Sequence, residues 1–194
     1  MQGPPQASLA ATDIACRRGD RLLFRGLSMS LAPGDVVHVT GTNGIGKSSL
    51  LRILGGLLRP FAGEIRREGA VGLVDERPAL DEHLPLGQAL GFWHRIDGAT
   101  ERFGAWALDP LLDVPVRFLS TGQRKRAAFA RLAAQAAPIW LLDEPLNGLD
   151  TNGVALVASA VAQHRASGGI CLLASHQPFP LDGMQVLALA EFAG

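Results

Sequence analysis

Tyrosine is absent from this sequence, and lysine and cysteine each occur only twice in 194 residues. Two cysteines are too few for a disulfide framework, and Cys16 and Cys171 both lie in strand-like runs, so we predict buried thiols. Gly, Arg or Asp interrupts every apolar run well before the roughly 18 residues that a membrane-spanning helix needs. The start of the chain, MQGPPQASLA, lacks the features of a signal peptide, so we expect a cytoplasmic protein.

An excess of charge of either sign is also missing, because 18 basic residues balance 18 acidic ones. A chain with zero net charge has no global field that attracts nucleic acid or an acidic membrane surface, so we expect no nucleic-acid partner. The length suits one domain, and 47% hydrophobic residues are enough for a substantial core. We therefore interpret residues 1–194 as a single domain.

Strand-like and helix-like segments alternate along the chain. Strands are expected near Leu9–Cys16, Leu27–Leu31, Val36–Thr40, Gly63–Arg67, Ala70–Val74, Ile139–Leu142 and Ile170–Ala174. Helices are expected over Lys47–Leu58, Gln123–Ala137 and Thr151–Ala166, and one face of the first carries Leu50, Leu51, Leu54, Leu57 and Leu58. This order predicts an α/β fold with a mostly parallel core sheet and an N-terminal antiparallel part. Short helical patterns make about 81–137 an inserted helical subdomain, between core segments of about 8–80 and 138–194.

A glycine-rich loop lies between the strand Val36–Thr40 and the following helix. It matches G-x-x-x-x-G-K-[ST] in the strand–loop–helix setting that this motif requires. Glycines allow backbone N–H groups to converge on phosphate oxygens, and the helix N-terminus adds partial positive charge. Lys47 can reach the β- and γ-phosphates of a nucleotide, and Ser48 can supply an oxygen to Mg²⁺. The predicted nucleotide-binding residues are Gly41, Thr42, Asn43, Gly44, Ile45, Gly46, Lys47, Ser48 and Ser49.

Two adjacent carboxylates follow the apolar run Ile139–Leu142. Such a run predicts a central strand buried on both faces, and open α/β sheets bind ligands at the carboxyl ends of their strands. Asp143 would hold Mg²⁺ directly or through water, and Glu144 would polarise the water that attacks the γ-phosphate. The pair therefore predicts a metal residue and a general base for nucleotide hydrolysis.

A second anion site is predicted where the helix that begins near Gln123 follows Ser120, Thr121 and Gly122. A serine hydroxyl, backbone N–H groups and a helix N-terminus together favour phosphate. One chain has no need of two cradles for a γ-phosphate, whereas two chains placed head-to-tail would each close over the other's nucleotide. A nucleotide kinase is the rival interpretation, but it would need an arginine-rich acceptor lid and would leave Ser120–Gln123 unexplained.

With these motifs in this order, the chain resembles the ATP-binding cassette (ABC) family over nearly its whole length. The family's Walker A motif matches Gly41–Ser48, its Walker B motif matches Ile139–Asp143, and its signature loop matches Ser120–Gln123. The resemblance implies a P-loop NTPase fold and hydrolysis of ATP with Mg²⁺. It also implies a head-to-tail homodimer on ATP binding, and integral membrane partners at the cytoplasmic face of a bacterial inner membrane.

The resemblance gives roles to three further residues. His176 matches the family's switch histidine, which would contact the γ-phosphate and help to hold Glu144 and the attacking water. Asp150 ends the matching D-loop, Asn147–Asp150, and would lie at the dimer interface. Glu76 falls where the family has its Q-loop glutamine and could bind metal through water. Standing alone, the remaining histidines are more often core or surface residues: His38, His83, His94 and His164.

Three positions depart from the family pattern. Thr121 stands where the family usually has glycine, and a β-branched side chain narrows the approach to phosphate. A carboxylate replaces the glutamine at Glu76. No tyrosine is present to stack on adenine, and the matching turn offers Arg17 and Arg18 instead, so we expect modest nucleotide affinity and weak choice between ATP and GTP.

Within the family, local strings resemble the ATPase subunits of the haem exporter of cytochrome c maturation. These strings are Asp75–Leu80, Val114–Ser120, His164–Gly169 and Ser175–Pro178. The resemblance implies that ATP hydrolysis drives delivery of haem onto a haem-carrying chaperone, or release of that chaperone. No haem site is readable, and we expect no direct haem binding. The alternatives are an ATPase for a lipoprotein or peptide exporter, and a soluble ABC ATPase without a transport role.

Aromatic residues gather in the helical piece at Phe92, Trp93, Phe103 and Trp106. Ordinary core packing is one interpretation of these rings. Docking of a membrane helix is the other, and it requires an exposed patch among them.

Overall fold

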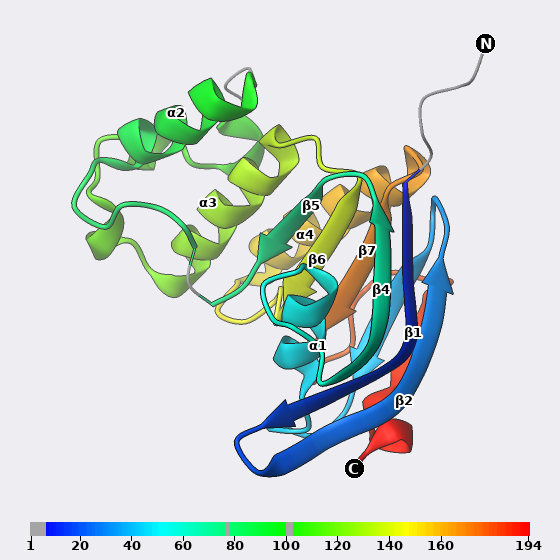
Figure 1. Cartoon of the computed structure of the whole chain (residues 1–194). Coiled ribbons are helices and arrows are strands. Elements are labelled where there is room, and N and C mark those ends of the chain that lie inside the picture. The colour runs from blue at the N-terminus through cyan, green and yellow to red at the C-terminus, as the bar shows by residue number, and fades with distance from the viewer. Residues whose placement is uncertain (1–6, 77, 100–102) are drawn as a thin grey trace.

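The computed structural model describes residues 7–76, 78–99 and 103–194 (Figure 1). Arg77, part of the string Asp75–Leu80, lies outside the described residues. The chain forms two sheets, one antiparallel and one parallel, which confirms the predicted α/β class with an N-terminal antiparallel part. None of the described helices is long and apolar enough to cross a membrane.

The antiparallel sheet has three strands in the order β2-β1-β4. Strands β1 (Ser8–Arg18) and β2 (Arg21–Leu31) form a hairpin, and β4 (Ala62–Glu68) pairs with the other edge of β1. The second strand is longer than the predicted Leu27–Leu31, because its pairing with β1 continues through Arg21. Pairing within the hairpin, which continues up to its turn, therefore sets the length of this strand.

The parallel sheet has five strands in the order β5-β6-β7-β3-β8. They are β3 (Val36–Thr40), β5 (Val71–Val74), β6 (Ile139–Asp143), β7 (Ile170–Ala174) and β8 (Gln185–Ala188). All residues of β6 and β7 are buried, as expected for central strands covered on both faces. The sequence analysis missed β8, a four-residue edge strand whose side chains are half exposed.

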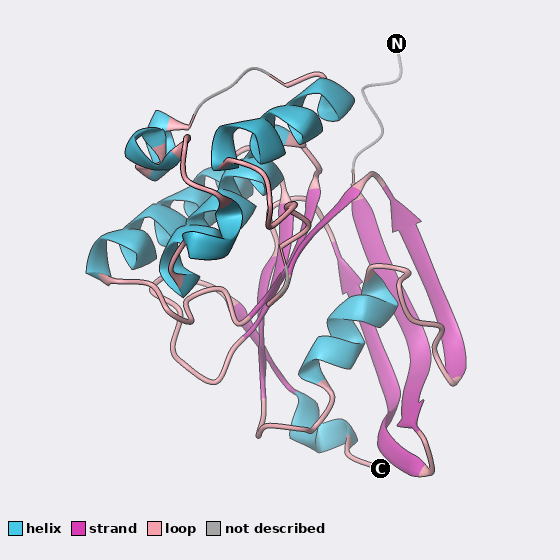
Figure 2. Ribbon diagram, turned by 90° about the vertical axis from the view of Figure 1, so that its left-hand side faces the viewer, coloured by secondary structure: helices cyan, strands magenta, loops and turns pink. Residues whose placement is uncertain are grey.

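The alternation of side chains along the parallel strands separates two cores. Ile139 and Leu141 pack in one core with the antiparallel sheet and α1 (Lys47–Leu54). Trp140 and Leu142 pack in the other core, with the helices α2 (Leu86–Asp97), α3 (Thr121–Ala134) and α4 (Thr151–Ala166). Figure 2 shows the helical part on one side of the parallel sheet and the antiparallel sheet on the other. Cys16 and Cys171 are buried free thiols in these cores, as predicted.

Helix α1 ends at Leu54, four residues before the predicted end at Leu58. Gly55 caps the helix, and Gly56 adopts a left-handed conformation (φ 78°) that turns the chain away. Leu57 is consequently 68% exposed, so its predicted place on the buried face was wrong. Leu54, on the same helix, is fully buried.

The described part of the segment between β5 and α3 is helical but irregular. Besides α2 it holds three short 3₁₀ turns, at Gly104–Trp106, Asp109–Leu111 and Val116–Phe118, and a fourth, Leu189–Phe192, lies near the C-terminus. Phe103 and Trp106 are core residues, whereas Phe92 is 48% exposed. The four aromatic residues therefore divide between the two interpretations.

Leu54→Ala should lower the free energy of unfolding by about 2–5 kcal/mol, because it leaves a cavity in a packed core. The matched control Leu57→Ala should change it by less than about 0.5 kcal/mol, because that side chain is in solvent. Urea unfolding monitored by circular dichroism measures both values. Equal losses for the two variants would contradict the observed end of α1.

Candidate functional site

The glycine-rich loop connects β3 to the first residue of α1. Gly46 precedes the helix with φ 117°, a conformation that residues with side chains rarely adopt. A Cβ atom at this position would also lie 3.1 Å from a ring carbon of Phe24 and 3.3 Å from the Cβ of Leu23. Both the backbone and the packing therefore require glycine here.

Lys47 is buried at the start of α1, with 7% of its surface exposed. Its ammonium group donates hydrogen bonds to the carbonyl oxygens of Gly41 at 2.8 Å and Thr42 at 3.3 Å. The loop thus folds around the ammonium group of Lys47. Phosphate oxygens could replace these carbonyl oxygens as acceptors, because an ammonium group has three donors and no fixed plane.

Asp143 ends β6 and is only 6% exposed. Burial raises the pKa of its carboxyl group, and the negative charges of Glu144 and Glu76 raise this pKa further. A hydrogen bond with Ser48 acts in the opposite direction and lowers it. Its Oδ1 atom is buried and has no hydrogen-bond partner among the described residues. A buried carboxylate oxygen without a partner, beside a hydroxyl group, fits the oxygen ligands that Mg²⁺ prefers.

Of the predicted metal residues, Asp143 and Glu76 lie at or just after the carboxyl ends of the paired strands β6 and β5, and Ser48 hydrogen-bonds to Asp143. The described part of the chain contains no cluster of three or more His, Cys, Asp or Glu side chains that could hold a metal ion alone. Mg²⁺ in P-loop proteins is usually completed by substrate phosphates and water. The donor set here suits such a shared site.

Glu144 and His176 come from neighbouring strands and meet beyond their carboxyl ends. The Nδ1 atom of His176 lies 3.0 Å from Oε2 of Glu144. The Glu144 side chain is 14% exposed and that of His176 is 47% exposed, so the pair borders solvent. The N–H of Glu144 donates to the carbonyl of Ala174 at 2.8 Å, which extends the pairing of β6 with β7. The geometry suits a carboxylate that accepts a proton from water while the imidazole orients it.

Ser120 and Gln123 form a capping box at the start of α3. The Ser120 hydroxyl accepts from the Gln123 N–H at 3.2 Å, and the Gln123 amide oxygen accepts from the Ser120 N–H at 2.8 Å. Asp150 caps α4 in a similar way, accepting from the N–H of Gly153 at 2.7 Å. These predicted phosphate-binding or interface residues thus also fix the starts of two helices.

Thr121 and Gly122 pack against the turn that follows β6. A Cβ atom on Gly122 would collide with the carbonyl group of Gly148, so only glycine allows this approach. A Cβ atom on Gly148 would in turn lie 2.8 Å from the side-chain methyl group of Thr121. The sequence analysis considered Thr121 only as an obstacle to phosphate and missed this contact with the matching D-loop.

Lys125 was given no role by any motif, but it is 7% exposed and its ammonium group donates to the carbonyl of Glu144 at 3.1 Å. The only signal in the sequence was compositional, since it is one of two lysines among 18 basic residues. The sequence analysis suggested that Arg17 could stack on adenine. In the structure its guanidinium group lies over the ring of Phe61, 4.6 Å from the ring centroid.

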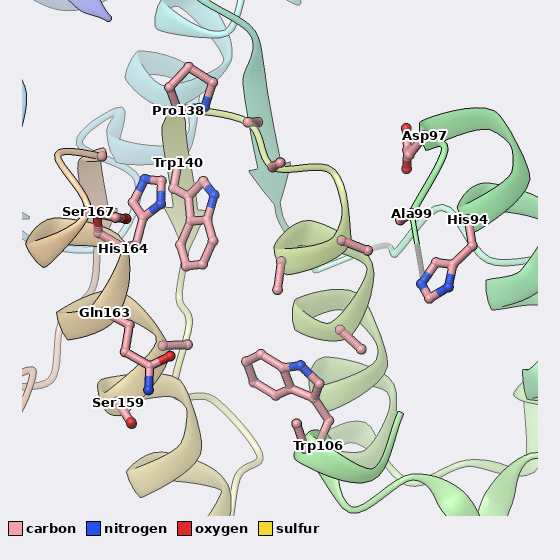
Figure 3. Close-up of a pocket in the computed structure, with 18 of the residues that line it drawn as sticks. His94, Asp97, Ala99, Trp106, Pro138, Trp140, Ser159, Gln163, His164 and Ser167 are labelled. Atoms are coloured by element: carbon pink, nitrogen blue, oxygen red, sulfur yellow. The ribbon is translucent and has the colours of Figure 1, made fainter. Parts of the chain in front are cut away.

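A separate cavity of about 1160 Å³ lies between the helices (Figure 3), and Trp140 of the Walker B run lines it. In its wall Trp140 and His164 stack with ring centroids 4.0 Å apart. Burial lowers the pKa of His164, and hydrogen bonds to the carbonyls of Ile170 and Pro138 oppose that shift. His164 thus has the character of a core histidine, and none of the predicted nucleotide-binding residues lines this cavity.

Comparisons with known proteins agree with the motifs. Residues 24–147 match the family model described as ABC transporter. A protein of Novosphingobium aromaticivorans named cytochrome c biogenesis ATP-binding export protein CcmA is 60% identical, and the match covers 96% of this chain and 98% of that protein. The protein of the same name from Zymomonas mobilis is 51% identical, with 96% and 86% covered.

Solved structures give the same fold. A putative ABC transporter ATP-binding protein from Pyrococcus furiosus superposes with a TM-score of 0.80 at 21% identity, covering 96% of this chain and all of that one. The strand order, the phosphate loop and the family match are mutually consistent. The chain therefore belongs to the ABC transporter family of ATP-binding proteins, and its relatives there include proteins named cytochrome c biogenesis ATP-binding export protein CcmA.

Proposed function

We propose that the chain is the ATP-hydrolysing subunit of a membrane ABC exporter that serves cytochrome c biogenesis, by exporting haem or releasing a haem-carrying chaperone. The single observation that carries the proposal is similarity over nearly the whole length to relatives named cytochrome c biogenesis ATP-binding export protein. Because these relatives share one name and align with nearly the whole chain, they favour this function over that of a lipoprotein or peptide exporter. The balanced charge of the chain argues against a soluble role on nucleic acid.

In the proposed mechanism, Lys47 releases the carbonyls of Gly41 and Thr42 and binds the β- and γ-phosphates of ATP. Ser48 and Asp143, with Glu76 nearby, would hold Mg²⁺, which neutralises charge on the phosphates. Glu144 accepts a proton from the attacking water, and His176 keeps its carboxylate oriented through the 3.0 Å contact. Water therefore attacks the γ-phosphate directly, and no covalent intermediate with the protein is needed.

A second copy of the chain would complete each site. The signature residues Ser120–Gln123 of one protomer would cover the ATP that is held by Gly41–Ser48 of its partner, with Asp150 at the interface. Head-to-tail pairing gives both phosphate-binding segments of each chain a use, which a monomer does not. ATP would thus act as part of the dimer interface.

Membrane subunits are proposed to dock on α2 at the cytoplasmic face of the inner membrane. Phe92 and Ile96 lie one turn apart on this helix and are 48% and 60% exposed. Trp93 is engaged elsewhere, because its indole N–H donates to the carbonyl of Ala79 and its ring lies under Arg131. The docking surface is therefore the pair Phe92 and Ile96.

Glu144→Gln should lower the rate of ATP hydrolysis by about 10²–10⁴-fold while preserving ATP binding, because the amide cannot accept the proton from water. With Mg²⁺ and ATP this variant should also accumulate as a dimer. Phosphate release and size-exclusion chromatography with light scattering measure the two effects. The control is Glu64→Gln, an exposed carboxylate on β4 that should behave like the native chain. Full turnover by Glu144→Gln would refute its role as the base.

Phe92→Glu combined with Ile96→Glu should prevent co-purification of integral membrane proteins, because two buried charges would be forced into an apolar contact. ATP binding by the purified chain should not change. The matched control is Leu57→Glu, which places a charge on an exposed leucine near α1. Identification of the co-purified proteins by mass spectrometry tests the exporter at the same time. Partners without a role in haem handling would reject the cytochrome c assignment.

A further inference from the structure

Lys125 is a buried cation near the N-terminus of α3, the helix that begins at the signature loop. It lies in the second turn of α3, five residues after Ser120, and is 7% exposed. Lysine is almost never buried unless it is paired. Its ammonium group donates a hydrogen bond to the backbone carbonyl of Glu144 at 3.1 Å, which connects α3 to the end of β6.

Glu144 has an unusual backbone at this point. Its φ of 46° is in the left-handed region, which is strained for a residue with a side chain. Three contacts hold its peptide groups: its N–H donates to Ala174 at 2.8 Å, and its carbonyl accepts from Asn147 N–H at 3.3 Å and from Lys125. Only the contact with Lys125 comes from the helical part of the chain.

The surroundings of Lys125 are strongly acidic. Burial lowers the pKa of its ammonium group, and the negative charges of Asp143, Glu76, Asp75 and Glu144 oppose that shift. Three of these carboxylates belong to the candidate site, namely the candidate metal residues Asp143 and Glu76 and the candidate base Glu144. Lys125 therefore supplies positive charge behind the carboxylates, on the side of α3.

We propose that Lys125 is a positioning residue for ATP hydrolysis, holding the Glu144 peptide in the left-handed conformation that directs its carboxylate toward His176. The proposal rests on the role of Glu144 as the base. Lys125 acts through the carbonyl of Glu144 and does not touch the nucleotide. Lys125 and the signature residues belong to the same helix, α3. If α3 moves when its signature residues bind the nucleotide held by the partner, Lys125 moves with it and changes the position of Glu144 in its own chain.

Lys125→Met removes the donor and the charge but keeps a side chain of similar length. We expect kcat for ATP hydrolysis by the full chain to fall by about 100-fold, as for other displacements of about 1 Å of a catalytic group. The Kd for ATP should stay unchanged, because the phosphate loop is untouched. Lys125→Arg keeps a cationic donor and should retain a kcat closer to that of the native chain. A kcat for Lys125→Arg as low as that of Lys125→Met would overturn the role of the donor.

Arg126→Met is the matched control for the loss of a cation from α3. The guanidinium group of Arg126 donates to the carbonyls of Trp106 and Ala107, so it holds the helical part of the chain and not Glu144. We expect this control to lower the thermal midpoint while leaving kcat of the folded protein near the native value. A loss of kcat equal to that of Lys125→Met would assign the effect to general loosening of α3 and overturn the proposal.

A double-mutant cycle with Glu144→Gln separates this inference from the proposed function. If Lys125 acts through Glu144, Lys125→Met should lower the single-turnover rate no further when Glu144 is already Gln. An additional loss in that background, an unchanged kcat for Lys125→Met alone, or a parallel loss of ATP affinity would each overturn the proposal. Full activity of Glu144→Gln would instead contradict the base assignment itself.

Discussion

The candidate site depends on the parallel alignment of β3, β6 and β7 at one edge of the sheet. Their shared direction brings the phosphate loop after β3, the acidic pair at the end of β6 and the histidine after β7 to the same place. Hydrogen bonds between adjacent strands fix the spacing, and the bond from Glu144 N–H to Ala174 continues it into the site. The burial of both central strands therefore also positions the chemistry.

Most of the site could be predicted because its residues are adjacent in the sequence and their chemistry demands particular side chains. A phosphate loop, a buried strand that ends in two carboxylates and a serine at a helix start are local patterns. The strand–loop–helix order and the antiparallel part were predicted for the same reason. The meeting of Glu144 and His176 was implied by family resemblance and could not be derived from their separation along the chain.

Most of the features that were missed depend on contacts between segments that are distant in the sequence. The spacing of Leu57 fits the apolar face of a helix, but the two glycines after Leu54 end α1 before it reaches Leu57. Strand β8 becomes recognisable only through its pairing with β3. The packing of Thr121 on Gly148 joins two motifs that the sequence analysis treated separately. For β8 and Thr121 a neighbour in space decides the outcome, whereas for Leu57 the two glycines beside it in the sequence do.

Gly122 and Gly148 meet with no room for even a methyl group between them. Two backbones in such direct contact cannot slide or tilt independently without leaving a void or a clash. The beginning of α3 and the turn before α4 are consequently in direct contact, although they belong to separate elements. Neither segment can approach the other more closely without a clash, so the spacing of these two motifs is set at the main chain.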